Sequence, residues 1–513
     1  MIKEADLSNF KVLMLYPNQR TVSLVPPSLA LFSSLLKERN AEVKLFDTTF
    51  YRMDCEDSDK AREKNLTVHP VNEASLVIEY HNGNVFEDLC KVVEDFRPNI
   101  ILATATDSTF PLALDLFKAV QKYKSQYHFL TLLGGVFATF APERSISYPE
   151  IDIICVGEGE GPLIDLCDRL CKGESYDDIP NIWLKTKEGT IVKNKVRPPA
   201  DISELPSPDF SIFDEKRLYR MMGGKVYKML PIETHRGCPY MCTYCGSPTQ
   251  NRFYLEQTSS KFYREKSLRE VKEDLLFQIK KWKPTYIFFW ADTFLAYSEE
   301  KIDEFCEFYS KIKIPFYCQA RPETITESKI IKLKAVGLDR VGVGIEHGNE
   351  QYRSTVLKRY YKNSQVIECM EIVRKHGISF SLNNIIGLPD ETPELAMDTV
   401  ELNRSIKGFE DSSCSIFQPY YGTPLRALCV EKGYISPDLI CPHNASDSLL
   451  NMPSFPKERI SGLARTFSLY IRLPKDRWDE IKVAEKFTEE GNAMFEKLSQ
   501  EVIEKFFVPE SDL

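Results

Sequence analysis

The chain alternates short apolar runs with amphipathic stretches, and it does so in two separate series. The first series extends from about residue 10 to residue 201, and the second begins near residue 229. A strand buried on both faces reads as a short apolar run, and a helix that covers a sheet reads as an amphipathic stretch. Because strands that alternate with helices form parallel sheets, this pattern predicts two sheets of mostly parallel strands. The fold class is therefore α/β.

The first series, over residues 1–200, predicts a Rossmann-like, flavodoxin-like domain with a doubly wound sheet. The expected strands are Lys11–Tyr16, Glu42–Phe46, Ile100–Thr104, Phe129–Leu133 and Ile151–Cys155. The expected helices are Leu29–Arg39, Phe86–Phe96 and Ala113–Tyr123. Residues 53–73 are rich in charge and are expected to form an irregular insertion.

A proline-rich stretch without periodicity separates the two series and predicts a linker over residues 201–228. The expected strands of the second series are Met229–Glu233, Tyr286–Trp290, Phe316–Ala320, Arg340–Ile345, Phe380–Ile386 and Ser413–Gln418. Such a series is enough for a partial (β/α)6 barrel of the TIM type, which we place at residues 229–435. Beyond it the strand signals stop, so residues 436–513 are expected to form a small helical C-terminal domain.

Length and charge exclude several classes of protein. A chain of 513 residues is too long for one core and predicts two or three domains. No apolar stretch approaches the roughly 20 residues of a membrane-spanning helix, and the charged first residues lack the apolar segment of a secretory signal. The net charge of −9 argues against a nucleic-acid partner, which usually leaves a basic surface. We expect a cytoplasmic protein without a transmembrane segment.

One group among the 14 cysteines is clustered. Cys238, Cys242 and Cys245 lie in one short loop with glycine and proline, directly after the first expected strand of the second series. Thiolates suit iron–sulfur clusters, whereas a structural zinc site would want a fourth Cys or His at a comparable spacing. His235 precedes the loop and is expected to pack or to form a hydrogen bond. Three protein ligands leave one iron of a [4Fe-4S] cluster open for an exogenous ligand.

The spacing C-x3-C-x2-C, with the aromatic Tyr244 just before the last cysteine, resembles the signature of the radical S-adenosylmethionine (SAM) superfamily. The resemblance implies that a [4Fe-4S] cluster on Cys238, Cys242 and Cys245 binds the amino and carboxylate groups of SAM at its open iron. It also implies that an electron from an external flavodoxin- or ferredoxin-like donor cleaves SAM to methionine and a 5′-deoxyadenosyl radical.

Polar residues at the ends of the later expected strands extend this resemblance. Gly344-Ile-Glu346-His-Gly348 is similar to the Gly-x-Glu-Ser-Gly element of one subgroup, with His347 in place of serine. Polar residues at the carboxyl ends of barrel strands are expected to line an active site. The implied SAM contacts are Tyr244, Trp290, Asp292, Gln319, Arg321, Glu346, Asn383 and Asn384. Tyr420 and Tyr421, after the sixth strand, are the candidates for substrate binding or catalysis.

The first series resembles the cobalamin-binding domain that precedes the barrel in the cobalamin-dependent subgroup. The matching pieces include Thr104-Ala-Thr-Asp-Ser108, Gly134-Gly135-Val-Phe137 and Val156-Gly-Glu158-Gly159-Glu160. Glycines after a strand let the backbone approach a bulky flat ligand at the carboxyl edge of a sheet. The implied cobalamin contacts are Thr104, Ser108, Gly134, Gly135, Val136, Phe137, Glu158 and Gly159.

The sequence departs from related domains at the lower face of cobalt. The Asp-x-His-x-x-Gly loop of methionine synthase-like domains, whose histidine ligates cobalt from below, is absent. The subgroup's Gly-Gly-x-His reads Gly-Gly-Val-Phe137, and none of the seven histidines has the required context. Bound cobalamin is thus expected to have an apolar or water-occupied lower face. The alternative is a vestigial domain that binds no cobalamin.

The resemblance favours a methyltransferase that uses the cluster, SAM and cobalamin to methylate an unactivated carbon of a small molecule or natural product. In methylating members, cobalt takes a methyl group from one SAM, and a second SAM yields the radical. A non-methylating cyclase, oxidase or rearrangement enzyme is the first alternative, and a non-catalytic cobalamin sensor is the second. A methylthiotransferase would need three further cluster cysteines, whose spacing the first series does not supply. We expect a monomer or a weak dimer.

Overall fold

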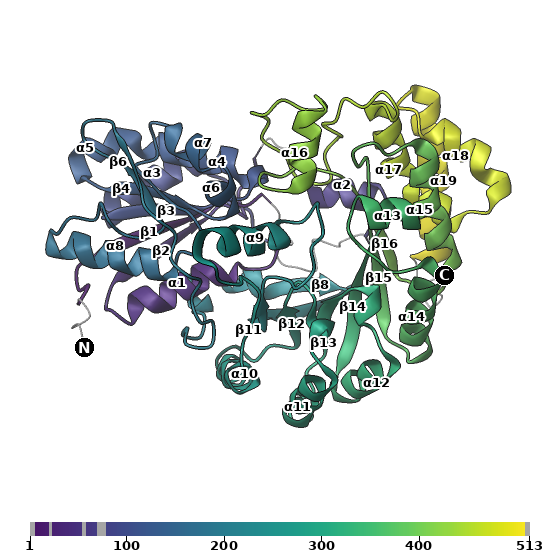
Figure 1. The fold of residues 1–513 in the computed structure, drawn as a ribbon, viewed down its shortest axis with the longest axis horizontal. Helices are drawn as coiled ribbons and strands as arrows, with labels where there is room; N and C mark the ends of the chain where they lie inside the picture. The colour runs from purple at the N-terminus through teal and green to yellow at the C-terminus, as the bar shows by residue number, and fades with distance from the viewer. Residues whose placement is uncertain (1–5, 20–22, 54–57, 69–77, 508–513) are drawn as a thin grey trace.

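The computed structural model describes residues 6–19, 23–53, 58–68 and 78–507, in which two sheets lie side by side with helices around each (Figure 1). The first sheet has the strand order β2-β1-β3-β4-β5-β6-β7, and the second has the order β16-β15-β14-β13-β12-β9-β8. Five consecutive strands of the first sheet and six of the second are parallel. The prediction of an α/β chain with two mostly parallel sheets is confirmed.

The first sheet is doubly wound because successive residues of its strands serve two different cores. Its parallel strands are β1 (Lys11–Tyr16), β2 (Glu42–Asp47), β3 (Ile100–Thr104), β4 (Leu130–Gly134) and β5 (Ile153–Cys155). In β1, Met14 packs with α1 (Pro27–Lys37) and α8 (Glu160–Lys172). Leu13 packs on the other face with α3 (Val85–Phe96) and α4 (Phe110–Val120). The order 2-1-3-4-5 is that of flavodoxin-like folds, whose ligands lie at the carboxyl edge.

Two features of the first sheet differ from the sequence prediction. The strands β6 (Ile182–Lys185) and β7 (Ile191–Lys193) form an antiparallel hairpin that extends the sheet beyond β5. The insertion at residues 53–73 contains the helix α2 (Ser58–Lys64), while residues 54–57 and 69–73 lie outside the described residues. Neither strand of the hairpin is longer than 4 residues, too short for the alternating pattern of a strand to stand out.

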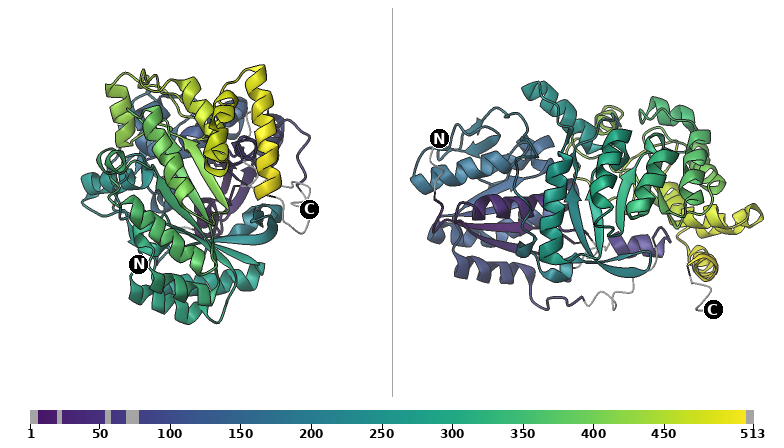
Figure 2. Two further views of the ribbon diagram at one scale, coloured as in Figure 1. Left: turned by 90° about the vertical axis from the view of Figure 1, so that its right-hand side faces the viewer. Right: turned by 90° about the horizontal axis from the view of Figure 1, so that it is seen from below.

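The second sheet is a partial barrel that stays open between its two edge strands. Its parallel strands are β9 (Lys225–Glu233), β12 (Tyr286–Trp290), β13 (Phe316–Ala320), β14 (Leu338–Glu346), β15 (Ser379–Ile386) and β16 (Asp411–Ile416). The helices on its outer side are α10 (Leu268–Trp282), α11 (Glu299–Tyr309), α12 (Glu327–Val336), α14 (Asn363–Lys375) and α15 (Pro393–Ser405). Figure 2 shows this arrangement from two further directions. The six strand–helix units of the sequence prediction are confirmed, although β9, β14, β15 and β16 begin one to four residues earlier than expected.

The segment 201–228, predicted as a linker, is not wholly irregular. It contains β8 (Tyr219–Met222), which pairs antiparallel with β9 and forms one edge of the second sheet. The turn between the two strands is Gly223-Gly224, and both glycines have positive φ, as a tight hairpin turn requires. This Gly-Gly pair was the available sequence signal for the hairpin.

The helices that follow β16 complete the core of the last barrel strands. They are α16 (Pro424–Glu431), α17 (Lys457–Arg472), α18 (Trp478–Ala484) and α19 (Glu489–Phe506). Phe467 of α17 and Leu498 of α19 are fully buried in the same apolar cluster as Ile386 of β15 and Ile416 of β16. No helix in the described part of the chain has the length and hydropathy needed to span a membrane.

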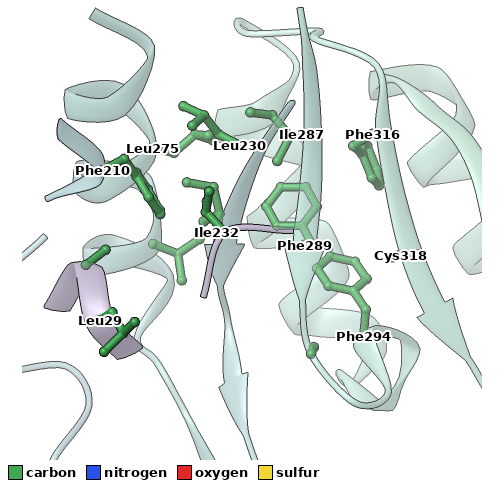
Figure 3. Close-up of a cluster of buried hydrophobic side chains, with 14 of the residues drawn as sticks. Leu29, Phe210, Leu230, Ile232, Leu275, Ile287, Phe289, Phe294, Phe316 and Cys318 are labelled. Atoms are coloured by element: carbon green, nitrogen blue, oxygen red, sulfur yellow. The ribbon is translucent and has the colours of Figure 1, made fainter. Parts of the chain in front are cut away.

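One apolar cluster contains buried side chains from both halves of the molecule. Figure 3 shows Leu29 of α1 and Phe210 beside Leu230 and Ile232 of β9, with Leu275 of α10 packed against them. All five side chains are nearly or fully excluded from solvent. The cluster therefore joins one face of the first sheet to the outer face of the barrel, and it fixes how the carboxyl edges of the two sheets face each other.

Candidate active site

Cys238, Cys242 and Cys245 lie at the carboxyl edge of the barrel, in the loop between β10 (His235–Arg236) and α9 (Gly246–Thr258). The first two thiols are buried and the third is half-buried. Gly237, which starts this loop, has a φ of +87°, and a Cβ there would lie 2.8 Å from Cδ1 of Phe262. Only glycine adopts this backbone conformation without strain, so Gly237 determines the direction in which the chain leaves β10. We call residues 237–245 the cysteine loop.

Two buried guanidinium groups stand beside the cysteine loop. Nη1 of Arg321 lies 2.9 Å from Sγ of Cys242, and Nη1 of Arg359 lies 3.7 Å from the same sulfur. Arg359 also donates a hydrogen bond of 3.1 Å to the hydroxyl oxygen of Tyr244. Burial raises the pKa of Cys245 to about 12. Fixed cations beside thiols favour the thiolate form that iron requires.

The three thiols of the cysteine loop fit an iron–sulfur cluster better than a single metal ion. Among the residues that the structure describes, no three His, Cys, Asp or Glu side chains are placed to hold one metal ion. In a cubane each thiolate binds a different iron, so its ligands need not converge on one point. Nδ1 of His235 lies 2.9 Å from Oγ1 of Thr234, and its ring packs 4.1 Å from that of Tyr297. It packs and forms a hydrogen bond, as the sequence suggested.

A cavity of about 400 Å³ opens at the mouth of the barrel. Tyr244, Glu346, Asn383 and Asn384, four of the predicted SAM contacts, line it. Glu346 has a φ of +67°, a left-handed conformation that costs energy in a residue with a side chain, and its carboxylate pairs with Arg359 at 3.4 Å. Strained residues of this kind gather at functional sites. The cavity therefore brings the end of β14 and the inner face of β15 to the cysteine loop.

The other predicted SAM contacts are distributed over three environments. Trp290 and Asp292 line a second cavity at the domain interface, and burial raises the pKa of Asp292. Gln319 is solvent-exposed at the end of β13, and Arg321 is held by Cys242 and by Glu323.

Asn384 does not offer its side chain to the barrel interior. Its Nδ2 donates to Oδ1 of Asn403 in α15 at 3.2 Å and to the carbonyl of Ser413 in β16 at 3.0 Å. Side chains alternate across a strand, so Asn383 and its neighbour must face opposite ways. The side chain of Asn384 therefore connects β15 to α15 and β16, and its contact with SAM stays a prediction.

The second cavity, of about 540 Å³, lies between the carboxyl edge of the first sheet and the cysteine loop. We call it the interface cavity. The predicted cobalamin contacts that line it are Thr104, Gly134, Gly135, Val136, Glu158 and Gly159. Cys245, Trp290 and Asp292 line it from the barrel. A ligand in this cavity touches both domains at once.

Ser108 and Phe137 are not among the residues that line the interface cavity. Phe137 is fully buried, and its ring stacks on that of Phe110 with centroids 4.2 Å apart. Ser108 lies in the turn before α4, with its Oγ 3.1 Å from Oγ1 of Thr106. Phe137 points into the core of the first domain, so its side chain does not face the interface cavity.

The two glycines after β4 have different roles. Gly135 has a φ of +93°, and a Cβ there would lie 2.5 Å from the carbonyl oxygen of Ala105. The fold itself thus requires Gly135. A Cβ on Gly134 would meet nothing closer than 3.9 Å, so this position has room for a methyl group. Gly134, which lines the cavity, is therefore the glycine whose backbone can closely approach a ligand.

Tyr420 and Tyr421, the candidates for substrate binding, separate in the structure. Tyr420 lines the cavity at the barrel mouth. Tyr421 packs on the first domain, where its ring meets that of Phe137 edge-on and its N–H donates to Oδ1 of Asp107 at 3.2 Å. Tyr421 thus joins the two domains, and only Tyr420 remains a candidate for contact with substrate.

Replacing Asp107 by asparagine should stabilise the protein at neutral pH. Burial raises the pKa of Asp107 to about 6, although Tyr421 N–H and Arg426 oppose this shift. A carboxyl whose pKa is higher in the folded state than in the unfolded state destabilises the fold as pH rises through the window from about 4 to 6. Asn keeps the acceptor for Tyr421, so we expect a gain of about 1–3 kcal/mol at pH 8 and about half that gain at pH 5.

Urea denaturation at the two pH values measures this difference. Asp115→Asn, in the same helix region but half exposed and paired only with Lys118, is the control and should change little. An equal gain for Asp107→Asn at both pH values would contradict the assignment of a buried, ionised carboxylate.

Sequence reasoning missed the charged groups that surround the cysteine loop. Arg359, which contacts Cys242, lies in the segment after α13 (Glu350–Thr355), where no motif marks it. Arg236 stands two residues before Cys238 and pairs with Glu158, Glu160 and Glu233. Its place next to the cysteine motif was a signal, but the partners from the first domain lie 76 and 78 residues away in the sequence.

Family models match both halves of the chain. The model described as the Radical SAM superfamily matches residues 232–402, and the model described as the B12 binding domain matches residues 70–166. The first match includes the cysteine loop and β12 to β15, and the second includes β3, β4 and β5.

Several known proteins are similar over most of the chain. An uncharacterized methyltransferase, PH0819 of Pyrococcus horikoshii, is 26% identical over 78% of this chain and 86% of its own length. Cytidylyl-2-hydroxyethylphosphonate methyltransferase of Streptomyces wedmorensis is 20% identical over 88% of this chain and 87% of its own length. The structure of the radical SAM methyltransferase TsrM from Kitasatospora setae, with cobalamin and a [4Fe-4S] cluster bound, has a TM-score of 0.61 at 16% identity and covers 82% of this chain and 78% of that one. At such low identity, this likeness shows a common fold.

Proposed function

Since the chain belongs to the cobalamin-dependent radical SAM enzymes, with a B12-binding domain ahead of a radical SAM domain, we propose that it methylates an unactivated carbon of a small molecule. The observation that carries the proposal is the interface cavity, which Gly134 lines from the first domain and Cys245 lines from the cysteine loop. Methyl transfer between two cofactors requires both to face one enclosed space. The names of the two relatives described above support a methyl transfer.

The two domains imply a [4Fe-4S] cluster, SAM and cobalamin as cofactors. When bound, these groups supply the adenosyl radical and the transferable methyl group, while the protein positions them and excludes water. We assign the cluster to Cys238, Cys242 and Cys245, with Arg321 and Arg359 stabilising the negative charge on sulfur. Further assignments are Tyr244, Glu346 and Asn383 to SAM, and Thr104, Gly134, Gly135, Val136 and Gly159 to cobalamin.

We also propose the following organisation and setting. The cobalamin domain occupies residues 1–200, the connecting segment 201–228, the barrel 229–435 and the C-terminal helices 436–513. A flavodoxin- or ferredoxin-like protein supplies the electron, and the enzyme acts in the cytoplasm as a monomer or weak dimer. A reducing compartment keeps cluster thiols from forming disulfides, which supports this location.

The methyl-transfer proposal can be tested without knowing the substrate. The anaerobic, reconstituted protein is given SAM with a deuterated methyl group and a chemical reductant, together with a small-molecule extract. We expect both S-adenosylhomocysteine and 5′-deoxyadenosine, because a methylating enzyme uses one SAM for each purpose, and we expect a deuterated methyl group in a product. Formation of 5′-deoxyadenosine alone would instead favour the non-methylating alternative, and formation of neither would favour a sensor.

Bound cobalamin should lack a protein nitrogen ligand. His235 lines the interface cavity, the one histidine in the described ranges to do so, and its ring is held by Thr234 through Nδ1 at 2.9 Å and by the ring of Tyr297 at 4.1 Å. His81 stacks on Tyr51, and His128 ends α5 (Lys124–Tyr127) ahead of β4, at the edge of the sheet opposite Gly134. We therefore expect the electron paramagnetic resonance spectrum of the cob(II)alamin form to show no splitting by a coordinated nitrogen. Such a splitting that disappears in His235→Phe would prove this expectation wrong.

A further inference from the structure

The loop Val156–Glu160, which joins β5 to α8, is held by residues on both sides of the cysteine loop. Oε1 of Glu158 accepts a hydrogen bond from Nη1 of Arg236 at 2.8 Å, and Oε2 accepts one from Nη1 of Arg264 at 3.0 Å. Arg236 belongs to β10, which leads into the cysteine loop, and Arg264 belongs to the partner strand β11 (Arg264–Glu265). Both cations therefore connect the first domain to the start of that loop.

The far end of the cysteine loop reaches the same carboxylate residue. Cys245 is followed at once by α9, and the hydroxyl oxygen of Tyr254 in α9 accepts a hydrogen bond of 2.7 Å from the N–H of Glu158. Gly157 allows this approach, because a Cβ there would lie 2.6 Å from the same hydroxyl. Glu158 thus bonds through its side chain to one flank of the cysteine loop and through its backbone to the other.

These contacts leave Glu158 no free oxygen for a cofactor. Oε1 also accepts from Nη2 of Arg264, and Oε2 also accepts from the N–H of Ala200 at 2.9 Å. The side chains of Glu158 and Arg236 are only 12% and 17% exposed. Hydrogen bonds between buried ionised groups are short and directional, so they fix geometry as well as contribute energy. Glu158, which the sequence predicted as a cobalamin contact, therefore uses its carboxylate oxygens in contacts between the two domains.

We propose that Glu158, Arg236, Arg264 and Tyr254 form an interdomain latch that sets the position of the cysteine loop relative to the cobalamin-binding edge of the first sheet. These four are positioning residues rather than cofactor ligands. The latch lines the interface cavity through Glu158 and Arg236, so a shift in the latch moves the two walls of that cavity relative to each other. A displacement of about 1 Å between reacting groups costs on the order of 100-fold in rate, so the latch would affect turnover. This role in turnover rests on the proposed function.

Hydrogen exchange of the full-length protein without cofactors tests the latch itself. Arg264→Met removes one cation without altering the cysteine loop. We expect the amide protons of residues 156–160 to exchange about 10- to 100-fold faster, because Glu158 keeps its buried charge but loses a partner. Arg197→Met is the matched control, since Arg197 pairs with Asp165 of the same α8 at 2.6 Å but makes no ion pair with the barrel. Unchanged exchange at residues 156–160 in Arg264→Met would overturn the proposal.

The effect on cofactor placement is measured in the loaded protein. Iron and corrinoid content are determined first, and then the spin–spin interaction between the reduced cluster and cob(II)alamin is recorded. We expect Arg264→Met to bind both groups at wild-type levels with a broadened or weakened interaction, and Arg264→Lys to recover part of it. A wild-type interaction in Arg264→Met would contradict the positioning role. Failure of the wild-type protein to bind corrinoid would count against the proposed function, while the exchange experiment would still decide the latch.

Discussion

Replacing Cys238, Cys242 and Cys245 together by alanine is expected to remove all cluster iron, about four per chain, and to abolish 5′-deoxyadenosine formation. The physical reason is that no other thiol lies in the cysteine loop, and Arg321 and Arg359 would face each other without the sulfur anions that they stabilise. Iron analysis and the broad visible absorbance of the anaerobically purified protein provide the measurement.

The matched control for the cysteine experiment is Cys306→Ala. Cys306 is half-buried in α11, and burial raises the pKa of its thiol to about 11, so it resembles Cys245 in environment but lies outside the cysteine loop. The triple variant should keep the first domain folded, since none of the three cysteines belongs to the apolar cluster that joins the two halves. Wild-type iron content in the triple variant would refute the assignment of the cluster.

Replacing Gly134 by leucine is expected to weaken corrinoid binding by about 10- to 100-fold while leaving cluster iron unchanged. A Cβ at this position clears its nearest neighbours by 3.9 Å, so the fold accepts a side chain, but the rest of the leucine would enter the interface cavity. Binding is measured by titration with hydroxocobalamin, and iron is measured in the same sample.

Gly134→Ala separates steric exclusion from a loss of stability. Its single methyl group fits, so it should bind corrinoid almost as well as the wild type. Gly135→Ala is unsuitable as a probe, because φ of +93° and the contact with Ala105 would strain the fold even without a ligand. If Gly134→Leu binds hydroxocobalamin with wild-type affinity, the cofactor does not occupy this edge of the sheet.

The periodicity of the sequence was sufficient for the parallel strands but not for the side-chain partners. Strands such as Ile100–Thr104 are buried on both faces and read as continuous apolar runs, so their bounds followed directly from the sequence. Asn383 and Asn384 carry the same chemistry, yet they face opposite sides of β15, and the sequence does not state which side is the interior. The roles of the two residues became clear only from the hydrogen bonds of Asn384 to Asn403 and Ser413.

Two predicted cobalamin contacts of the first domain make their main contacts with other parts of the protein, for a common physical reason. Phe137 and Glu158 stand in segments that resemble cobalamin contacts, but each makes its main contacts elsewhere in the protein. Phe137 stacks on Phe110, 27 positions away in the chain, and Glu158 pairs with Arg264, 106 positions away. Such long-range partners leave no local pattern, so a motif can indicate the edge of the sheet where a ligand lies but not which of its residues the fold has already used.

The apolar cluster of Figure 3 has a consequence for how the polypeptide reaches its native state. Leu29 belongs to the first domain, and Leu230 and Ile232 belong to the barrel, so neither half alone can bury these side chains away from solvent. A barrel synthesised without residues 1–200 would expose an apolar patch on its outer face, and we expect it to aggregate. The two halves are thus one cooperative folding unit, and an exchange of the first domain between relatives succeeds only when the donor brings a matching face.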